Sequence, residues 1–296
     1  MPSKNDLYQG SLWQLTLTEL GHLKSEFVWA HDHHVLVNQF KTMRYQAPGQ
    51  TAYLVLKGEL NVETDAGRVT VGPGHWCVPH HGPRLLRMDT PGQHLSVRFR
   101  LYWPGGEPLF NAPIATVFTA EEGLLLEKKT RVLIRTVAKA IPGVAADLPW
   151  RKADLMTHFV FQRTFGAWLH AYVETMLRLG VVPSRLAKKD PRVLDLIKKL
   201  DEFPLTQTID EKSLFAGSGL SSSQMNRLFI QYFSCTPHQY LERRKFTHAR
   251  MLIRSSSLAI KEIAYEVGFG SLSAFSRWFK QKSRQSPREF KHKEQV

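Results

Sequence analysis

Two stretches of the sequence combine small hydroxyl side chains with an arginine, a combination suited to contacting nucleic acid. They run from Ser221 to Pro237 and from Ser271 to Pro287, an offset of 50 residues. Hydroxyl, amide and guanidinium groups form hydrogen bonds with base edges and phosphates, so the repeat predicts two DNA-contacting segments. The coinciding pairs are Ser221/Ser271, Ser223/Ser273, Arg227/Arg277, Phe229/Phe279, Gln231/Gln281 and Pro237/Pro287.

Each segment has the periodicity of a helix with two distinct faces. The apolar stripe is expected to face a core. It consists of Met225, Leu228, Phe229 and Tyr232 in the first copy, and of Phe275, Trp278 and Phe279 in the second. The residues that we expect to contact DNA are Ser222, Ser223, Asn226, Arg227 and Gln231, followed by Leu272, Ser273, Ser276, Arg277 and Lys280. Either arginine alone could equally be a solvated residue of an ordinary helical bundle, and the duplicated context favours DNA contact.

A helix, a glycine turn and a second helix are expected around each segment. Gly219 and Gly268 lie two and three residues before the two copies, and glycine tolerates the positive φ of a tight inter-helix turn. Thr208 to Glu211 is a candidate capping box for the first leading helix, and Ile260 opens the second. This arrangement predicts two helix-turn-helix units.

A hydroxyl, a proline and a Gln or Glu follow each copy, in Thr236-Pro-His-Gln239 and Ser286-Pro-Arg-Glu289. Both are N-terminal helix caps with proline at the first helical position. The first predicts a helix from Pro237 to about Arg254, roughly 27 Å long at ~1.5 Å per residue. Such a rod suits two recognition helices that read major-groove segments about one DNA turn, roughly 34 Å, apart.

The C-terminal sequence resembles the signature of the AraC/XylS transcriptional regulators. The resemblance covers roughly residues 190–293 and rests on residues 263–269, 273–280 and 286–291. It implies a seven-helix domain with two helix-turn-helix units that binds promoter DNA. The sequence departs from the family pattern at Phe215, where a small residue is usual, and at Ala259, where a hydroxyl cap is usual. Ser234 and Arg284 stand where a glycine is usual.

The charge distribution agrees with an anionic partner. The formal net charge is +14, which favours nucleic acid or an anionic surface. Residues 187–296 carry 20 Lys/Arg and 11 Asp/Glu, a net of +9, and residues 1–186 carry 20 and 15, a net of +5. With only two cysteines, no signal-peptide core after Met1 and no apolar run of spanning length, we expect a cytoplasmic protein that makes no membrane contact.

The first part of the chain is predicted to form strands. Leu95, Val97, Phe99, Leu101 and Trp103 alternate, and an alternating apolar set, Leu54, Leu56, Leu60 and Val62, lies upstream among Gly/Pro turns. We therefore expect an α+β chain, with an N-terminal antiparallel barrel or sandwich and an all-α C-terminal domain. The barrel loosely resembles the cupin-like sensor of the family. The expected boundaries are 1–182 for a sensing and dimerisation domain (helical over about 121–180), 183–190 for a linker and 191–296 for the DNA-binding domain.

Candidates for a ligand site lie in this barrel. Residues 44–51 lack the His-x-His and Glu ligands of metal-binding cupins, so we expect no metal and no cofactor. A cluster of histidines (His31, His33, His34, His75, His80, His81) is read either as an unusual metal site or as surface and loop residues, and the second reading is favoured. Effector-binding candidates are Tyr45, Trp76, His80, Arg98 and Arg100. Arginines in the lumen would suit a carboxylated or phosphorylated effector.

Three functions remain to be compared. We expect a non-enzymatic, effector-responsive regulator, and we favour activation although the residues do not separate it from repression. Its expected partners are double-stranded promoter DNA, a second copy of the chain, a small molecule and RNA polymerase. The alternatives are a cupin-type enzyme, disfavoured by the missing ligands and nucleophile-base motif, and a non-specific DNA binder, disfavoured by the paired capped motifs.

Overall fold

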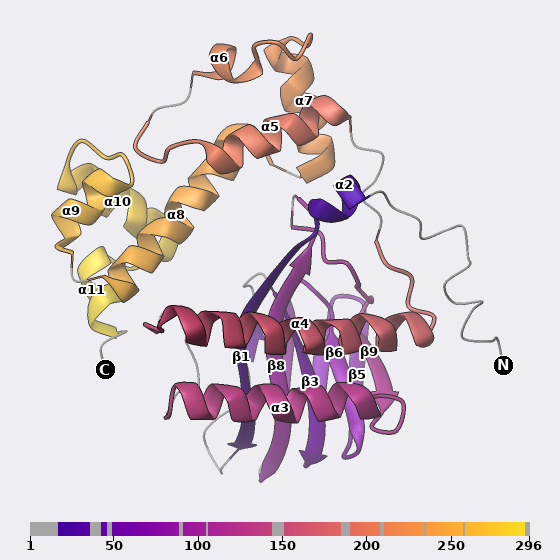
Figure 1. The fold of residues 1–296 in the computed structure, drawn as a ribbon. Coiled ribbons are helices and arrows are strands. Elements are labelled where there is room, and N and C mark those ends of the chain that lie inside the picture. Colours follow the sequence, from indigo (N-terminus) through magenta and orange to yellow (C-terminus); the bar gives the residue numbers. More distant parts are fainter. Residues whose placement is uncertain are drawn as a thin grey trace. The chain divides into compact units, whose positions relative to one another are not determined.

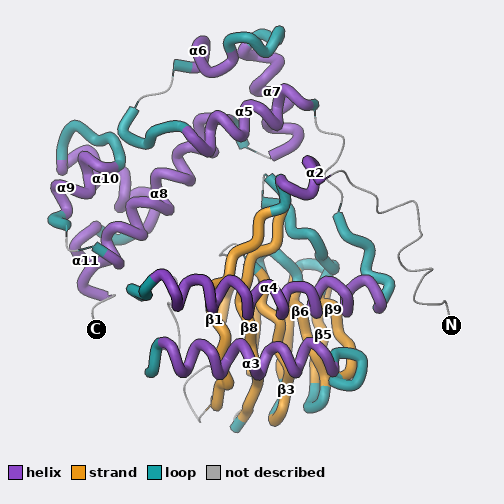
Figure 2. Tube along the Cα trace, in the orientation of Figure 1, coloured by secondary structure: helices purple, strands orange, loops and turns teal. Residues whose placement is uncertain are grey.

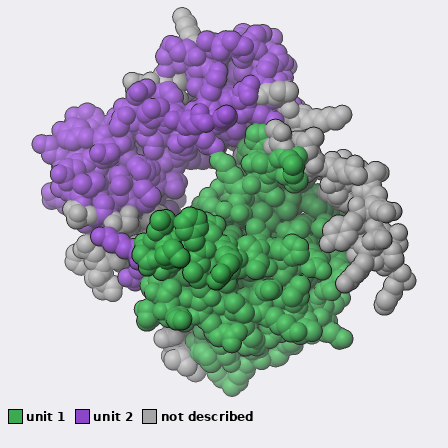
Figure 3. All heavy atoms as spheres, viewed as in Figure 1, with its two compact units in different colours: residues 1–149, 153–186 green, residues 150–152, 187–296 purple. Residues whose placement is uncertain are grey.

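The computed structural model describes residues 17–35, 43–45, 49–88, 91–104, 106–143, 151–184, 190–207, 210–233, 235–256 and 258–293. The chain divides into two compact units (Figure 3). Unit 1 comprises residues 1–149 and 153–186, and unit 2 comprises residues 150–152 and 187–296. Each unit is described by itself.

Unit 1 contains two antiparallel sheets over its described residues, as the strand pattern predicts. The first has the order β1-β8-β3-β6-β9 and the second β2-β7-β4-β5. The strands are β1 (Lys24–Val35), β2 (Met43–Tyr45), β3 (Gln50–Lys57), β4 (Leu60–Thr64), β5 (Gly67–Val71), β6 (His75–Pro79), β7 (Arg84–Met88), β8 (Gly92–Tyr102) and β9 (Ala115–Thr119). A short helix, α2 (Leu17–Gly21), precedes them.

Apolar side chains from both sheets form a core between them. Tyr53 and Val55 of β3 pack there with Leu60 and Val62 of β4 and with Cys77 of β6. The alternating residues predicted from Leu54 to Val62 therefore do not all lie on one face. Leu54 is the cross-strand partner of Leu95 and lies on the opposite face of β3, because successive strand residues point to opposite sides.

Two helices cover that opposite face of the five-stranded sheet (Figures 1 and 2). They are α3 (Leu124–Ala140) and α4 (Leu155–Arg178). Phe99 of β8 lies edge-on to Trp168 and Tyr172 of α4, at 4.9 and 4.8 Å between ring centroids. The Trp168 indole donates to Thr130 Oγ1 of α3 at 2.8 Å, so the two helices and the sheet share one aromatic core.

The expected linker begins as part of unit 1. The Ser184 hydroxyl donates to the Pro108 carbonyl at 2.6 Å, and the Ser184 carbonyl accepts from Trp103 Nε1 at 2.8 Å. The backbone N–H of Ser184 donates to the Leu109 carbonyl at 2.7 Å. These three bonds hold Ser184 against the loop that follows β8, although the sequence pattern places it in a linker.

Unit 2 is all-helical over its described residues, and its helices α5 to α11 match the number implied by the family resemblance. They are α5 (Pro191–Glu202), α6 (Glu211–Phe215), α7 (Ser222–Phe233), α8 (Pro237–Ser255), α9 (Ile260–Glu266), α10 (Leu272–Ser283) and α11 (Pro287–Lys293). Asp190 caps α5 through the backbone N–H of Arg192, and Pro191 occupies the first turn, as the Asp-Pro step predicts. In the described part of the chain no helix has the length and apolar character needed to cross a membrane.

Candidate DNA interface

The first helix-turn-helix unit consists of α6, a glycine turn and α7. Gly219 has a φ of +67°, which a residue with a Cβ rarely adopts. Ser221 caps α7: its hydroxyl accepts the backbone N–H of Gln224 at 3.2 Å, and Gln224 Oε1 accepts the N–H of Ser221 at 3.0 Å. The candidate cap at Thr208 lies outside the described residues. Asp210 caps α6 instead, through Ser213.

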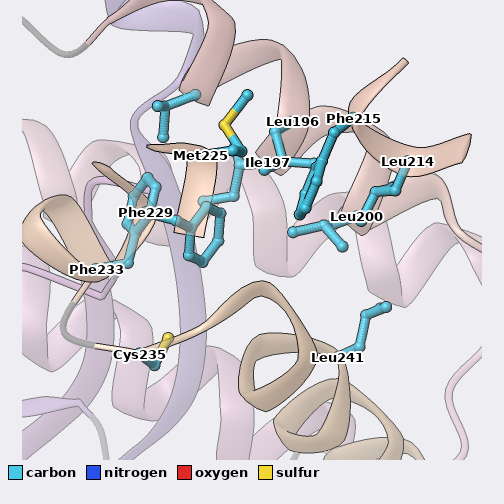
Figure 4. Packing of buried hydrophobic residues seen from close by; sticks show 11 residues of the cluster. Leu196, Ile197, Leu200, Leu214, Phe215, Met225, Phe229, Phe233, Cys235 and Leu241 are labelled. Atoms are coloured by element: carbon cyan, nitrogen blue, oxygen red, sulfur yellow. The ribbon is translucent and has the colours of Figure 1, made fainter. Parts of the chain in front are cut away.

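Helix α7 is held by an apolar cluster at the centre of this unit. Met225, Phe229 and Phe233 point from α7 towards α5 and α6 (Figure 4). Phe215, which replaces the small residue usual in the family, is 5% exposed and fills part of the same core. The bulky residue is therefore accommodated inside the cluster, and α7 is fixed by burial of aromatic surface.

The polar face of α7 divides into exposed and half-buried residues. Ser223, Arg227 and Gln231 are exposed, and Ser222 and Asn226 are half-buried. Asn226 Oδ1 is buried and has no hydrogen-bond partner within the described residues. A residue that the sequence pattern did not single out, Ile230, lies beside them and is 46% exposed.

The second helix-turn-helix motif repeats this arrangement of helix, glycine turn and helix with α9 and α10. Gly268 has a φ of +82°, and Ser271 caps α10 by accepting the N–H of Ala274 at 3.2 Å. Ala259 has no side chain with which to cap α9, but Glu262 still accepts its backbone N–H at 2.6 Å. A Cβ on Gly268 would lie 2.5 Å from the Leu205 carbonyl oxygen, so this turn packs tightly on the segment after α5.

An aromatic cluster holds α10. Phe275 and Phe279 are fully buried, and Phe246 of α8 packs against Phe279 with 5.4 Å between ring centroids. Trp278 is half-buried beside them and lies 4.8 Å from the ring of Phe269. These aromatic residues belong to the core, as their spacing predicts, and are not available for stacking on bases.

The outer face of α10 is strongly basic. Ser273, Arg277 and Lys280 are exposed, and Ser276 is half-buried. Leu272, expected on the DNA face, is half-buried and packs against the apolar cluster of this unit. Three further exposed residues at the end of α10 and its C-cap were not predicted as DNA contacts from the sequence: Gln281, Lys282 and Arg284. The charges of Lys282 and Arg284, and the position of Gln281 one helical turn beyond Arg277, could have identified them.

Helix α8 connects the two helix-turn-helix motifs of unit 2 and forms hydrogen bonds on both sides. Its capping box is formed by Thr236 and Gln239, as predicted, and its 19 residues span about 28 Å at 1.5 Å per residue. Tyr240 donates to Asp201 Oδ1 of α5 at 2.6 Å. On the other side, Glu242 accepts from Trp278 Nε1 of α10 at 2.6 Å and lies 3.8 Å from Lys282 Nζ.

The terminal helix repeats the capping chemistry. Ser286 and Glu289 form a reciprocal pair of bonds at the start of α11, at 2.7 and 3.2 Å, as the Ser-Pro-x-Glu pattern predicts. Arg284, which stands in place of a glycine, ends α10 with a φ of +62°. It is the only non-glycine residue with positive φ in the described ranges. Ser234, the corresponding residue of the first copy, lies outside the described residues.

The effector candidates of unit 1 do not converge on one site. Arg98 and Arg100 share a face of β8 directed away from α3 and α4, because Phe99 between them packs on α4. Trp76 lies on the helix-covered face, with its ring stacked on Phe118 at 6.0 Å, so it does not join these arginines. His80 is hydrogen-bonded to the Ala112 carbonyl at 2.8 Å. The side chain of Tyr45 lies outside what is described.

Several histidines gather on the arginine-bearing side of the sheet. The rings of His31 and His33 lie 5.2 Å apart, and His94, which the sequence pattern did not single out, lies 5.2 Å from His33. Burial lowers the pKa of His31 to about 4 and that of His94 to about 3, so both rings are neutral at pH 7. Within the described residues no group of three His, Cys, Asp or Glu side chains could hold a metal ion.

Comparisons with known proteins agree with this geometry. A family model described as a helix-turn-helix domain matches residues 215–293. The chain is 26% identical over 229 residues to the HTH-type transcriptional activator RhaS of Klebsiella pneumoniae, covering 75% of this chain and 77% of that protein. It is 30% identical over 130 residues to the HTH-type transcriptional regulator GlxA of Rhizobium meliloti, covering 43% of this chain and 40% of that protein.

A solved structure extends the likeness to the fold of both units. Apo ToxT from Vibrio cholerae has a TM-score of 0.51 and 13% sequence identity, and the match covers 89% of this chain and 96% of that one. At this identity the likeness concerns the fold alone. The sequence relatives are regulators of transcription, and the family match falls on the duplicated helix-turn-helix units. The chain therefore carries an AraC-type helix-turn-helix domain at its C-terminus, and over most of its length it is similar to regulators of transcription.

Proposed function

We propose that α7 and α10 each enter the major groove and read two successive segments of one promoter site. The observation that carries this proposal is the repetition of an exposed Ser/Arg face, Ser223 with Arg227 and Ser273 with Arg277, on two capped helices joined by α8. Helix α8 spans about 28 Å. When the width of the flanking helices is added, this length is compatible with two recognition helices in major-groove segments roughly 34 Å apart.

The residues have separate roles in this proposal. Arg227 and Arg277 contact base edges, where a bidentate arginine recognises guanine. Lys280 contacts phosphate and contributes to affinity without sequence preference. The half-buried Ser222, Asn226, Leu272 and Ser276 shape the surface behind these contacts, and Gln231 lies at the far end of α7.

Salt-dependent binding of the full chain to promoter fragments tests the proposal. We expect Arg227→Ala and Arg277→Ala each to relax specificity by ~1–3 kcal/mol, at different base positions, and Lys280→Gln to weaken all duplexes alike and reduce the salt slope by about 1. Arg135→Ala on the exposed face of α3 is the matched control. If the unmodified chain shows no preference over random duplex, the alternative of a non-specific DNA binder replaces the proposal.

We further propose that unit 1 is a cupin-like domain that senses an effector and pairs two copies of the chain. Leu155, Met156 and Phe159 in the first turns of α4 are 70%, 71% and 57% exposed, an unusual concentration of large apolar residues at a surface. Sedimentation of the full chain at increasing concentration tests pairing, and a monomer at every concentration contradicts it. Promoter activation through RNA polymerase remains a prediction from the sequence, to be tested by transcription in a purified system.

A further inference from the structure

We infer that unit 1 binds a small carboxylate-bearing ligand in a pocket beside Arg100 and His81. The pocket has a volume of about 170 Å³ and is lined by residues that include Gly49, Gln50, His81, Arg100, Tyr102 and Pro108. This inference rests on the proposed role of unit 1 as a sensor only for its regulatory consequence; ligand binding itself stands or falls separately.

A carboxylate of the protein itself already occupies the donors at the edge of this pocket. Glu26 of β1 lies opposite Arg100 of β8. Its two oxygens are each 2.6 Å from a donor, one from Arg100 Nη1 and the other from the Tyr102 hydroxyl. The side chains of Arg100 and Glu26 are 34% and 44% exposed, so a carboxylate from solvent can compete for the same donors. The bridging geometry fits a planar group with two oxygens.

Polar groups in the buried part of the pocket wall are not used. Arg100 Nε and His81 Nδ1 are buried and have no hydrogen-bond partner within the described residues. A buried polar group without a partner destabilises the fold by about 1–3 kcal/mol, so a ligand or an ordered water that pairs with it is stabilising. An acceptor atom of a bound ligand would satisfy Arg100 Nε, and it would pair with His81 Nδ1 in the tautomer that carries the proton on that nitrogen.

Positive charge is concentrated around the same point. Two arginines lie close to Gly49. A Cβ placed on this residue would lie 3.4 Å from Arg100 Cγ and 3.8 Å from Arg98 Nε. The Arg84 guanidinium is 3.4 Å from the Gly49 carbonyl. Burial, together with the nearby charges of Arg84 and Arg100, lowers the pKa of His81 to about 4. An added anion would be attracted by Arg84 and Arg100 and would favour the protonated form of His81.

The pocket size and lining restrict the ligand class. A cavity of about 150 Å³ accommodates benzene, so this pocket suits roughly six to ten non-hydrogen atoms. Leu101 and Pro108 contribute to the lining, so the part of the ligand away from the carboxylate is expected to be apolar. A short-chain carboxylic acid fits these requirements better than inorganic phosphate, which has no apolar part to lie against Leu101 and Pro108.

Calorimetry and thermal unfolding of the full chain with sodium salts from acetate to hexanoate test the inference. The corresponding neutral amides and inorganic phosphate are measured at the same ionic strength. We expect a carboxylate of this series to bind and its amide not to bind. Arg100→Gln should weaken binding about 10- to 100-fold, the range for a lost charged hydrogen bond. Arg87→Gln, an exposed arginine of β7, is the matched control and should leave binding unchanged.

A second variant distinguishes a lost binding contact from a folding defect. Glu26→Gln removes the competing carboxylate and should tighten ligand binding several-fold, a gain that misfolding cannot produce. Absence of carboxylate binding across the series, equal binding of the amides, or binding unaffected by both Arg100→Gln and Glu26→Gln overturns the inference, and preference for phosphate overturns the assigned class. If a carboxylate binds through Arg100 but leaves promoter affinity unchanged, the pocket stands and the proposed sensor role fails.

Discussion

The two helix-turn-helix units share a backbone frame but differ in charge and in anchoring. Helix α7 presents one exposed cation, Arg227, whereas α10 and its C-terminal cap present Arg277, Lys280, Lys282 and Arg284. Caps and turn glycines repeat between the copies because they satisfy the same backbone requirements. The surface charge is free to diverge. The comparison indicates that the second copy contributes more of the electrostatic affinity.

The anchoring of the recognition helices differs as well. Glu242 of α8 is bonded directly to α10, through Trp278. In the first half, Tyr240 of α8 is bonded to Asp201 of α5, and α7 is held by its apolar cluster. The second recognition helix is therefore joined to α8 by a charged hydrogen bond. The first meets α8 by aromatic packing, with 6.0 Å between the ring centroids of Phe229 and Tyr240.

The largest expected difference between the copies concerns the turn glycines. Both have positive φ, which costs about 1–2 kcal/mol for a residue with a Cβ. A Cβ on Gly219 meets no atom within 4 Å, but on Gly268 it meets backbone at 2.5 Å. We expect Gly219→Ala to lower the free energy of unfolding by about 1 kcal/mol and Gly268→Ala by about 3 kcal/mol or more. Hydrogen exchange of peptides from each helix-turn-helix motif measures the two losses in free energy of unfolding.

The Gly219→Ala variant serves as the control for the cost of positive φ alone. Equal losses in the two variants would show that the contact between Gly268 and the Leu205 carbonyl does not restrict the second turn, and would remove one structural difference between the copies.

The anchoring bonds predict a smaller difference. Glu242→Ala should release α10 from α8 and lower its protection against hydrogen exchange by about 1.5–3 kcal/mol, because the lost bond involves a charged acceptor. Asp201→Ala is the matched change in the first half and should loosen the contact of α5 with α8 while leaving α10 protected. Loss of α10 protection in Asp201→Ala would show instead that unit 2 unfolds as a single cooperative body.

The smallest expected effect is a gain. Arg284 adopts the left-handed conformation that glycine adopts without strain. Arg284→Gly should therefore raise the free energy of unfolding by about 0.5–1 kcal/mol, part of the relief being offset by the greater freedom of glycine in the unfolded chain. Chemical denaturation followed by exchange of α10 peptides measures it.

Arg284→Ala is the control for this prediction, since it loses the same charge and keeps the strain. A gain of the same size in both variants would assign the effect to charge repulsion on α10 and not to the backbone.

The local features of unit 2 could be predicted from the sequence because each depends on neighbouring residues. The helix caps at Asp190, Thr236 and Ser286 and the glycine turns are short patterns whose hydrogen bonds close within a few positions. The apolar stripes of α7 and α10 follow from helical periodicity. Lys282 and Arg284 were missed as DNA contacts because they have no basic counterpart in the first copy, where Tyr232 and Ser234 stand.

The sequence by itself determined the duplication, the caps, the turn glycines and the alternation of β8, all of which are properties of residues near one another in the chain. Only the tertiary structure decided that Trp76 faces α3 and α4 while Arg98 and Arg100 face the other side, and that Leu272 belongs to the core. Both faces of β8 carry buried residues, unlike α7 and α10, whose apolar stripes mark the buried face. Which face of β8 meets the helices therefore depends on distant elements that pack on it, and the alternation of residues does not record those contacts.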